Sequence, residues 1–301
     1  MTRCLIALLA ATTLTAACGN GTTPGPETAL APAPDDPVIA QQADTTWMNA
    51  LQAGNTQSAG TALDADFEWT DAGGRTRERA DTLASLPALA GEFRDETERK
   101  TFHYGHLHVI TSERPDGRMM RVWALRPDGW RLFAAISTAL ATGATPFAAT
   151  APATAPAAVT AAGAPAAADC ENPCRKMPFE PVTDTTKEIA RIFQQLKMDE
   201  WHPNPDTWAP YVLDDVYYVT ATAQLSKNDR VEHLAKLKAS GAPTVPGDPV
   251  VSMRIHDFGD SAVMIARHTP FRGGKPYYSL RVWVLRDGRW QLANTQQTVI
   301  S

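Results

Sequence analysis

Cysteine is scarce in this chain. Only four of the 301 residues are Cys, and two of these, Cys4 and Cys18, lie at the N-terminus. The other two, Cys170 and Cys174, stand in the segment CENPC. Zinc sites usually need four Cys or His ligands, and no second Cys/His pair lies beside this segment. In a protein outside the cytoplasm, the pair predicts a disulfide that closes a tight loop, with metal binding as the alternative.

Several signatures of catalysis and of nucleic-acid binding are missing. The chain has no G-x-G-x-x-G, P-loop, H-E-x-x-H or G-x-S-x-G motif. Lys and Arg total 28 against 33 Asp and Glu, which gives a net charge of −5 and no concentrated basic stretch. A nucleic-acid partner normally requires a basic face, so none is expected. No cofactor is expected either.

The N-terminus has the pattern of an export signal. A short positive start, Met1 to Arg3, precedes the apolar run CLIALLAA, which is far shorter than the ~20 residues that span a bilayer. The run LTAAC, ending at Cys18, resembles a bacterial lipobox, in which the Cys carries the lipid. Residues 1–17 are therefore predicted to be a lipoprotein signal peptide. An ordinary signal peptide, cleaved near Ala17, is the alternative.

A lipobox implies several acyl chains on Cys18, which anchor a protein stably where one chain does not. Gly19, rather than Asp, follows the Cys. In a Gram-negative cell this implies sorting to the outer membrane, facing the periplasm. The membrane is thus an expected partner through the N-terminal lipid.

Composition divides the rest of the chain. Residues 18–37 are rich in Pro, Gly and Thr and predict a flexible tether, and residues 139–182 predict an Ala/Thr/Pro-rich linker that ends in the Cys pair. The stretches 38–138 and 183–301 have ordinary compositions and are predicted to be two domains.

One phrase occurs in both domains. RVWALRPDGWRL (121–132) returns as RVWVLRDGRWQL (281–292) at an offset of 160. Asp-Gly between two extended runs predicts a hairpin, here the last one of an antiparallel sheet. A Trp buries roughly 150–250 Å², so a structural role is expected for four tryptophans, with ligand stacking as the alternative: Trp123, Trp130, Trp283 and Trp290.

Both domains are predicted to begin with helices and to end in strands. Helical pieces at 77–86 and 227–237 follow the extended octets LDADFEWT (63–70) and LDDVYYVT (213–220). In the second domain, a further strand is predicted over 250–258. The first domain is expected to have a shorter or degraded strand in the same place, before His106.

This order resembles the nuclear-transport-factor-2-like superfamily, which includes SnoaL-like cyclases and ketosteroid isomerases. The similarity is greatest to its bacterial unknown-function branch, whose members often end in W-R-L-x-x-x-Q-x-T. The second domain has Trp290-Gln291-Leu292 and Gln296-Gln297-Thr298, whereas the first departs with Ile136-Ser137-Thr138. The resemblance implies an α+β fold class: two cone-shaped domains, each with N-terminal helices packed on a curved antiparallel sheet.

The resemblance also implies a cavity between the helices and the concave face of each sheet. Members of the superfamily often dimerise sheet to sheet, so the two copies are expected to form an intrachain pseudo-dimer. Independent domains on a string are the alternative.

The second cavity is the favoured binder of a small molecule, because Asn294 and Gln296 replace Ala134 and Ile136 on its last strand. The pocket candidates are the polar and aromatic residues of its predicted strands: Tyr217, Tyr218, Arg254, His256, His268, Tyr278, Asn294 and Gln296.

A weaker candidate for metal binding is the cluster His103, His106 and His108, in which the last two are expected to share a strand face. His108 has a counterpart in His268, which favours a shared structural or pocket role instead.

Catalysis is not assigned to any residue. Ketosteroid-isomerase-like sites need a carboxylate base in an apolar cavity, and the sequence does not identify one. The favoured function is non-catalytic binding of a small apolar ligand or of an envelope protein. The alternatives are a cofactor-independent isomerase, cyclase or hydrolase that uses the second cavity, and a purely structural scaffold.

Overall fold

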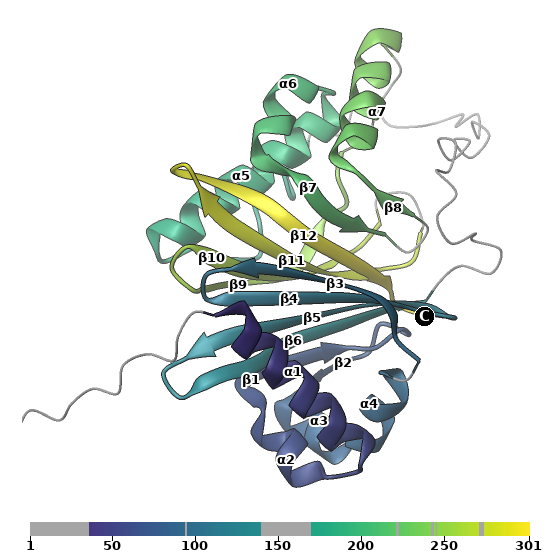
Figure 1. Cartoon of the computed structure of the whole chain (residues 1–301). Coiled ribbons are helices and arrows are strands. Elements are labelled where there is room, and N and C mark those ends of the chain that lie inside the picture. Colours follow the sequence, from purple (N-terminus) through teal and green to yellow (C-terminus); the bar gives the residue numbers. More distant parts are fainter. Residues whose placement is uncertain are drawn as a thin grey trace, which may run out of the picture. The chain divides into compact units, whose positions relative to one another are not determined.

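Two similar sets of helices and strands follow one another along the chain (Figure 1). The computed structural model describes residues 36–93, 95–139, 170–220, 223–241, 244, 246–270 and 274–301. We call residues 36–139 the first repeat and residues 170–301 the second repeat. The predicted signal peptide, Cys18, nearly all of the tether and residues 140–169 of the linker lie outside the described residues. Within the described ranges, no helix is both long and apolar enough to cross a membrane.

The first repeat begins with a 16-residue helix that Asp36 caps by accepting a hydrogen bond from the Val38 N–H. Its elements are α1 (Pro37–Gln52), α2 (Thr56–Thr61), β1 (Leu63–Thr70), β2 (Thr76–Glu78), α3 (Arg79–Ala84), α4 (Leu86–Glu92), β3 (Thr97–Tyr104), β4 (Leu107–Arg114), β5 (Gly117–Arg126) and β6 (Gly129–Ala139).

The second repeat begins with an 18-residue helix whose N-terminus has a capping box between Thr183 and Thr186. Its elements are α5 (Asp184–Trp201), α6 (Pro205–Trp208), a 3₁₀ turn (Ala209–Tyr211), β7 (Val212–Val219), β8 (Gln224–Leu225), α7 (Lys227–Ser240), β9 (Val250–Asp257), β10 (Ser261–His268), β11 (Tyr277–Arg286) and β12 (Arg289–Val299).

The two sheets have the same topology. The strand order is β2-β1-β6-β5-β4-β3 in the first repeat and β8-β7-β12-β11-β10-β9 in the second. The predicted α+β class with two tandem units is therefore confirmed. Each sheet is mixed rather than wholly antiparallel, because β1 pairs in parallel with β6, and β7 with β12.

One face of each sheet packs against the helices of its own repeat. We call these helix-facing sides the first and the second interior. In the first, Trp47 of α1 meets Trp123 of β5 edge-on, with ring centroids 6.2 Å apart. In the second, Phe193 of α5 and Trp283 of β11 belong to the same core cluster. All four tryptophans of the repeated phrase are between 0% and 6% exposed, which agrees with the structural role predicted for them.

The opposite faces of the two sheets are also buried. Val122 and Phe133 of the first repeat and Val263 and Val282 of the second belong to one hydrophobic cluster. The side-chain amide of Gln296 donates hydrogen bonds to the carbonyl oxygens of Arg118 and Ile136, at 3.0 and 3.1 Å. Residues 32–301 accordingly form one compact unit.

Two details of the first repeat differ from the prediction. The strand before His106 is not degraded, because β3 has eight residues, as many as β9. Its composition, TERKTFHY, concealed it, since an edge strand with a solvated face is polar along most of its length. The helical piece predicted over 77–86 is divided between β2 and two short helices, α3 and α4.

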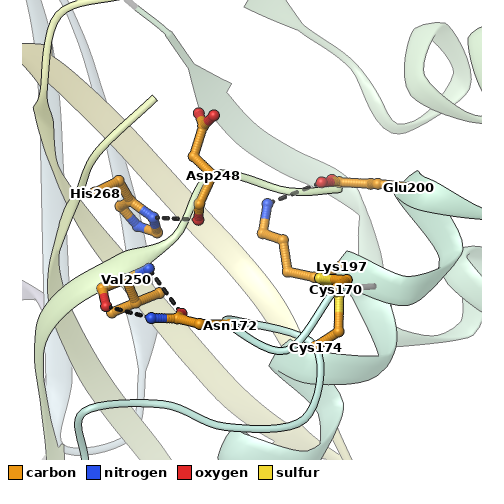
Figure 2. Close-up of a disulfide and its surroundings, with 8 residues drawn as sticks. All are labelled: Cys170, Asn172, Cys174, Lys197, Glu200, Asp248, Val250 and His268. Carbon is orange, nitrogen blue, oxygen red and sulfur yellow. Dashed lines mark hydrogen bonds and ion pairs between the residues drawn. A yellow bond between two sulfur atoms is a disulfide. The ribbon is translucent and has the colours of Figure 1, made fainter. Parts of the chain in front are cut away.

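Cys170 and Cys174 form a disulfide with Cα atoms 5.5 Å apart (Figure 2). The loop that it closes presents Asn172 to the start of β9, the edge strand of the second sheet. The Asn172 amide accepts from the N–H of Val250 and donates to its carbonyl, both at 2.9 Å. The side chain thus takes the place of a neighbouring strand at the point where β9 begins.

We predict that Asn172→Ala lowers the free energy of unfolding by about 1–3 kcal/mol, because the N–H of Val250, a buried residue, loses its acceptor. Urea denaturation followed by tryptophan fluorescence measures this loss. Asn204→Ala, which removes an exposed contact with Lys238, is the control and should change stability much less. Equal losses in the two variants would contradict the proposed role of Asn172.

Candidate functional site

A β-bulge in the last hairpin decides which side chains of β12 lie in the second interior. Residues 282 and 283 pair with 294 and 292, so Ala293 is the extra residue. Trp290 and Leu292 face the interior core, whereas Ala293 belongs to the cluster between the sheets. A one-residue slip reverses the faces of all later residues. Simple alternation from Trp290 therefore predicts the wrong face for Asn294 and Gln296.

The structure brings only two of the eight predicted pocket residues into the second interior. Tyr218 packs against the interior core, and His268 lies beside Ser279 and Phe193. The other six lie on the face that contacts the first repeat, which corrects their predicted placement in the second cavity: Tyr217, Arg254, His256, Tyr278, Asn294 and Gln296.

Contacts with the first repeat define the surroundings of these six. Arg254 pairs with Glu68, and the His256 ring meets the Phe133 ring edge-on at 4.8 Å. Arg254 and His256 do share a strand face, as predicted, but they line a groove of about 470 Å³ together with residues of β1 and α3. Burial raises the pKa of Tyr217 to about 12.

The three histidines of the first repeat do not form a set of ligands. His106 lies in the turn between β3 and β4, so it does not share a strand face with His108 as predicted. His103 and His108 face each other across the two strands, with ring centroids 5.7 Å apart. Burial, followed by the charge of His103, lowers the pKa of His108 to about 4. Across the described ranges, no group of three or more His, Cys, Asp or Glu side chains is arranged to hold a metal ion.

The first interior contains a buried arginine that is fully paired. Arg121 Nε donates to Asp44 Oδ1 at 2.8 Å and Nη2 donates to Oδ2 at 3.2 Å, while Nη1 pairs with Glu96. Asp44 also accepts from Trp123 Nε1 and pairs with Arg99. Burial acts to raise the pKa of Asp44, but the charge and the hydrogen bonds of Arg121 hold it below its usual value.

The second interior contains the equivalent arginine without a carboxylate. Arg281 Nη1 donates to the Ser279 hydroxyl and lies 3.5 Å from His268 Nε2. Its guanidinium carbon is 5.1 Å from the ring centroid of Phe193. In the part of the chain that the structure describes, no Asp or Glu oxygen forms an ion pair with Arg281.

The difference between the two arginines begins on the first helix of each repeat. The buried positions 40, 44 and 47 of α1 match 189, 193 and 196 of α5. Asp44 therefore corresponds to Phe193. The second repeat keeps the arginine on its strand but places an aromatic ring where the first repeat has its carboxylate.

Other charged side chains of the second interior pair with one another. Glu200 lies between Lys197 Nζ, at 2.8 Å, and Arg230 Nη2, at 3.0 Å; Figure 2 shows the Lys197 contact. Burial opposes ionisation of Glu200, but these two cations lower its pKa to about 2. Burial and the charges of Arg281 and Lys197 hold the pKa of His268 well below its usual value, so its ring is neutral near pH 7.

Sequence reasoning missed the residues that distinguish the two interiors, namely Arg281, Phe193 and Lys197. One signal was present, because Arg121 and Arg281 both belong to the repeated phrase. The contrast appears only when α1 is aligned with α5, which differ in sequence almost throughout.

Comparison with known proteins adds the names of similar solved structures. No protein-family model matches the chain, and no curated protein matches it. An NTF2-like protein from Cytophaga hutchinsonii is 16% identical and matches with a TM-score of 0.34 over 39% of this chain and 100% of its own. An NTF-2 like protein of unknown function from Silicibacter pomeroyi is 12% identical, with a TM-score of 0.31 over 38% of this chain and 96% of its own.

A third solved structure, from Caulobacter vibrioides, is an uncharacterised protein with a cystatin-like fold. It is 16% identical and matches with a TM-score of 0.31 over 40% of this chain and 92% of its own. Likeness at this level carries no argument about function. The fold described above depends on the elements and topology of this chain.

We predict that Asp44→Asn destabilises the protein by about 3–5 kcal/mol at pH 7, because it leaves a buried arginine without its main counter-charge. The folded pKa of Asp44 is below its unfolded value of about 3.9. The stabilisation is therefore complete above that value and is lost as the pH falls through the folded pKa. Urea denaturation at several pH values should show the gap between the two proteins narrowing below about pH 4.

Asp184→Asn is the matched control for this measurement. Like Asp44, Asp184 lies on the first helix of its repeat and pairs with a cation, Lys187. Its side chain, however, is fully exposed at the start of the helix. Its replacement should leave stability and its pH dependence nearly unchanged. A pH-independent gap for Asp44→Asn would show that the Asp44 charge is not the stabilising feature.

Proposed function

We propose that this chain is a non-catalytic binding protein whose second interior takes a small, largely apolar molecule with an anionic group. One observation carries the proposal: among the described residues, no carboxylate pairs with the buried Arg281, whereas Arg121 at the equivalent position has two. An unpaired buried cation is costly, and a bound anion removes that cost. The Phe193 ring packs on the guanidinium and belongs to a hydrophobic cluster, which suits an apolar ligand body.

The charges nearby support binding over catalysis. A ketosteroid-isomerase-like reaction needs a carboxylate that exchanges protons near neutral pH. Glu200 is held ionised by two cations, and Asp199 accepts hydrogen bonds from Gln195 and Thr207. Figure 2 shows the carboxylate of Asp248 pointing away from His268.

The contact between the two sheets suggests a role for the first repeat. Its interior arginine is paired by its own carboxylates, and its sheet contacts the second sheet through Val122 and Phe133 and through a hydrogen bond from Gln296. We therefore propose an intrachain pseudo-dimer, in which the first repeat acts as a built-in partner and the second repeat binds the ligand. An envelope protein remains the alternative partner to a small molecule.

The proposed setting is the cell envelope. Its support is the N-terminal pattern alone: a short apolar run, LTAAC ending at Cys18, and a Pro- and Gly-rich tether. In this proposal, the lipid on Cys18 holds the protein on the outer membrane and the tether lets the two repeats reach into the periplasm.

Native mass spectrometry of the mature chain tests the binding function. The protein is expressed in the periplasm with Cys18→Ser and purified without detergent, and its mass is recorded under gentle and under denaturing conditions. We expect an additional mass of a small organic molecule that is lost on denaturation. A bare chain in repeated preparations, with no thermal stabilisation by any small organic anion tested, would overturn the proposed function.

A further inference from the structure

We infer that the ligand of the second interior carries a carboxylate, which binds the Nε and Nη2 edge of Arg281 in the place that Asp44 fills in the first repeat. This inference rests on the proposed function and specifies the chemistry of the same site.

The two guanidinium groups differ in which nitrogens are occupied. In the first repeat, Nε and Nη2 of Arg121 hold the two oxygens of Asp44, and Nη1 and Nη2 also pair with Glu96. In the second, Nη1 of Arg281 donates to Ser279. Among the described residues, Nε and Nη2 of Arg281 donate no hydrogen bond. The two nitrogens that bind Asp44 in the first repeat therefore make no hydrogen bond with the described residues in the second repeat.

Arg281 is largely buried, but it is not sealed from solvent. Arg281 is 4% exposed and Arg121 is 0% exposed, so a small part of the second arginine stays accessible. A guanidinium cannot lose its proton to escape the desolvation cost. The two parallel N–H groups of the Nε and Nη2 edge match the two oxygens of a carboxylate in spacing and in plane.

The neighbouring groups favour a carboxylate over a larger oxyanion. Lys197 and Arg230 share the charge of Glu200, and His268 is neutral near pH 7. Among the described residues, no carboxylate forms an ion pair with Arg281. A carboxylate places two oxygens on the arginine, whereas phosphate or sulfate also buries further polar oxygens beside the apolar Phe193 ring.

The apolar neighbours indicate the rest of the ligand. The Phe193 ring lies over the guanidinium, and the His268 ring is stacked on Tyr277 with centroids 4.6 Å apart. Trp283 and Met264 belong to the same core. An aromatic or aliphatic carboxylic acid therefore fits the site better than a polar one.

Benzoate and octanoate are the probes, and benzamide, octanamide, phosphate and sulfate are the comparison compounds. Each is titrated into the Cys18→Ser protein by thermal shift and by calorimetry. We expect at least one carboxylate to raise Tm in a saturable way, its amide to bind at least tenfold more weakly, and phosphate and sulfate to have no saturable effect.

Two variants test the position of the site. Phe193→Asp gives the second repeat the carboxylate that the first repeat has at position 44, and it should abolish carboxylate binding while Arg281 is retained. Arg281→Lys keeps the charge but removes the pair of parallel N–H donors that binds both carboxylate oxygens, so it should weaken carboxylate binding at least tenfold. The second variant decides the question if the first does not fold.

The outcomes separate the inference from the proposed function. Equal binding of an amide and its carboxylate, a preference for phosphate or sulfate, or unchanged binding by Arg281→Lys would overturn the carboxylate inference while leaving a binding protein. Failure of both carboxylates overturns the inference, and the proposed function then stands only if native mass spectrometry still detects a bound molecule. Binding that is lost in both variants and selective for the acid supports the inference.

Discussion

The constraint on which the rest of this structure depends is that the central strands of each sheet are buried on both faces. A sheet with one solvated face alternates apolar and polar residues, but β5 is buried along nearly its whole length. Every polar side chain on these strands must then find a partner on one face or the other. The bulge after Leu292 decides which face Asn294 and Gln296 occupy. It thereby places these two polar groups in the contact between the repeats, while Arg281 lies on the interior face of the neighbouring strand β11, two residues before Trp283.

The two repeats solve the problem of a buried arginine in different ways. In the first, α1 supplies Asp44 and the segment after α4 supplies Glu96, so the interior is electrically complete without any other molecule. In the second, α5 supplies Phe193, and its own acidic residue, Glu200, is used by Lys197 and Arg230. The lack of a carboxylate beside Arg281, among the described residues, therefore becomes apparent only against the paired Arg121 of the first repeat.

The proposed function gives a reason for two copies in one chain. The interior arginine of the first repeat is paired by its own carboxylates, and the sheet of this repeat covers its neighbour. Among the described residues, no carboxylate pairs with Arg281 of the second repeat. In the proposal, the first copy contributes stability while a ligand serves as the counter-charge in the second, and binding stabilises the folded state.

Much of the fold could be predicted from local sequence, because hairpins, caps and strand periodicity depend on near neighbours. The Asp-Gly turns, the repeated strands, the buried tryptophans and the α+β class all follow from such patterns. The polar composition of β3 does not indicate a strand. The face of the sheet on which Asn294 and Gln296 lie depends on a bulge that the local sequence does not predict. What only the tertiary structure decided is which charges meet: Asp44 and Arg121 are 77 residues apart, and whether a buried arginine is paired depends on that distant contact rather than on its own neighbours in the chain.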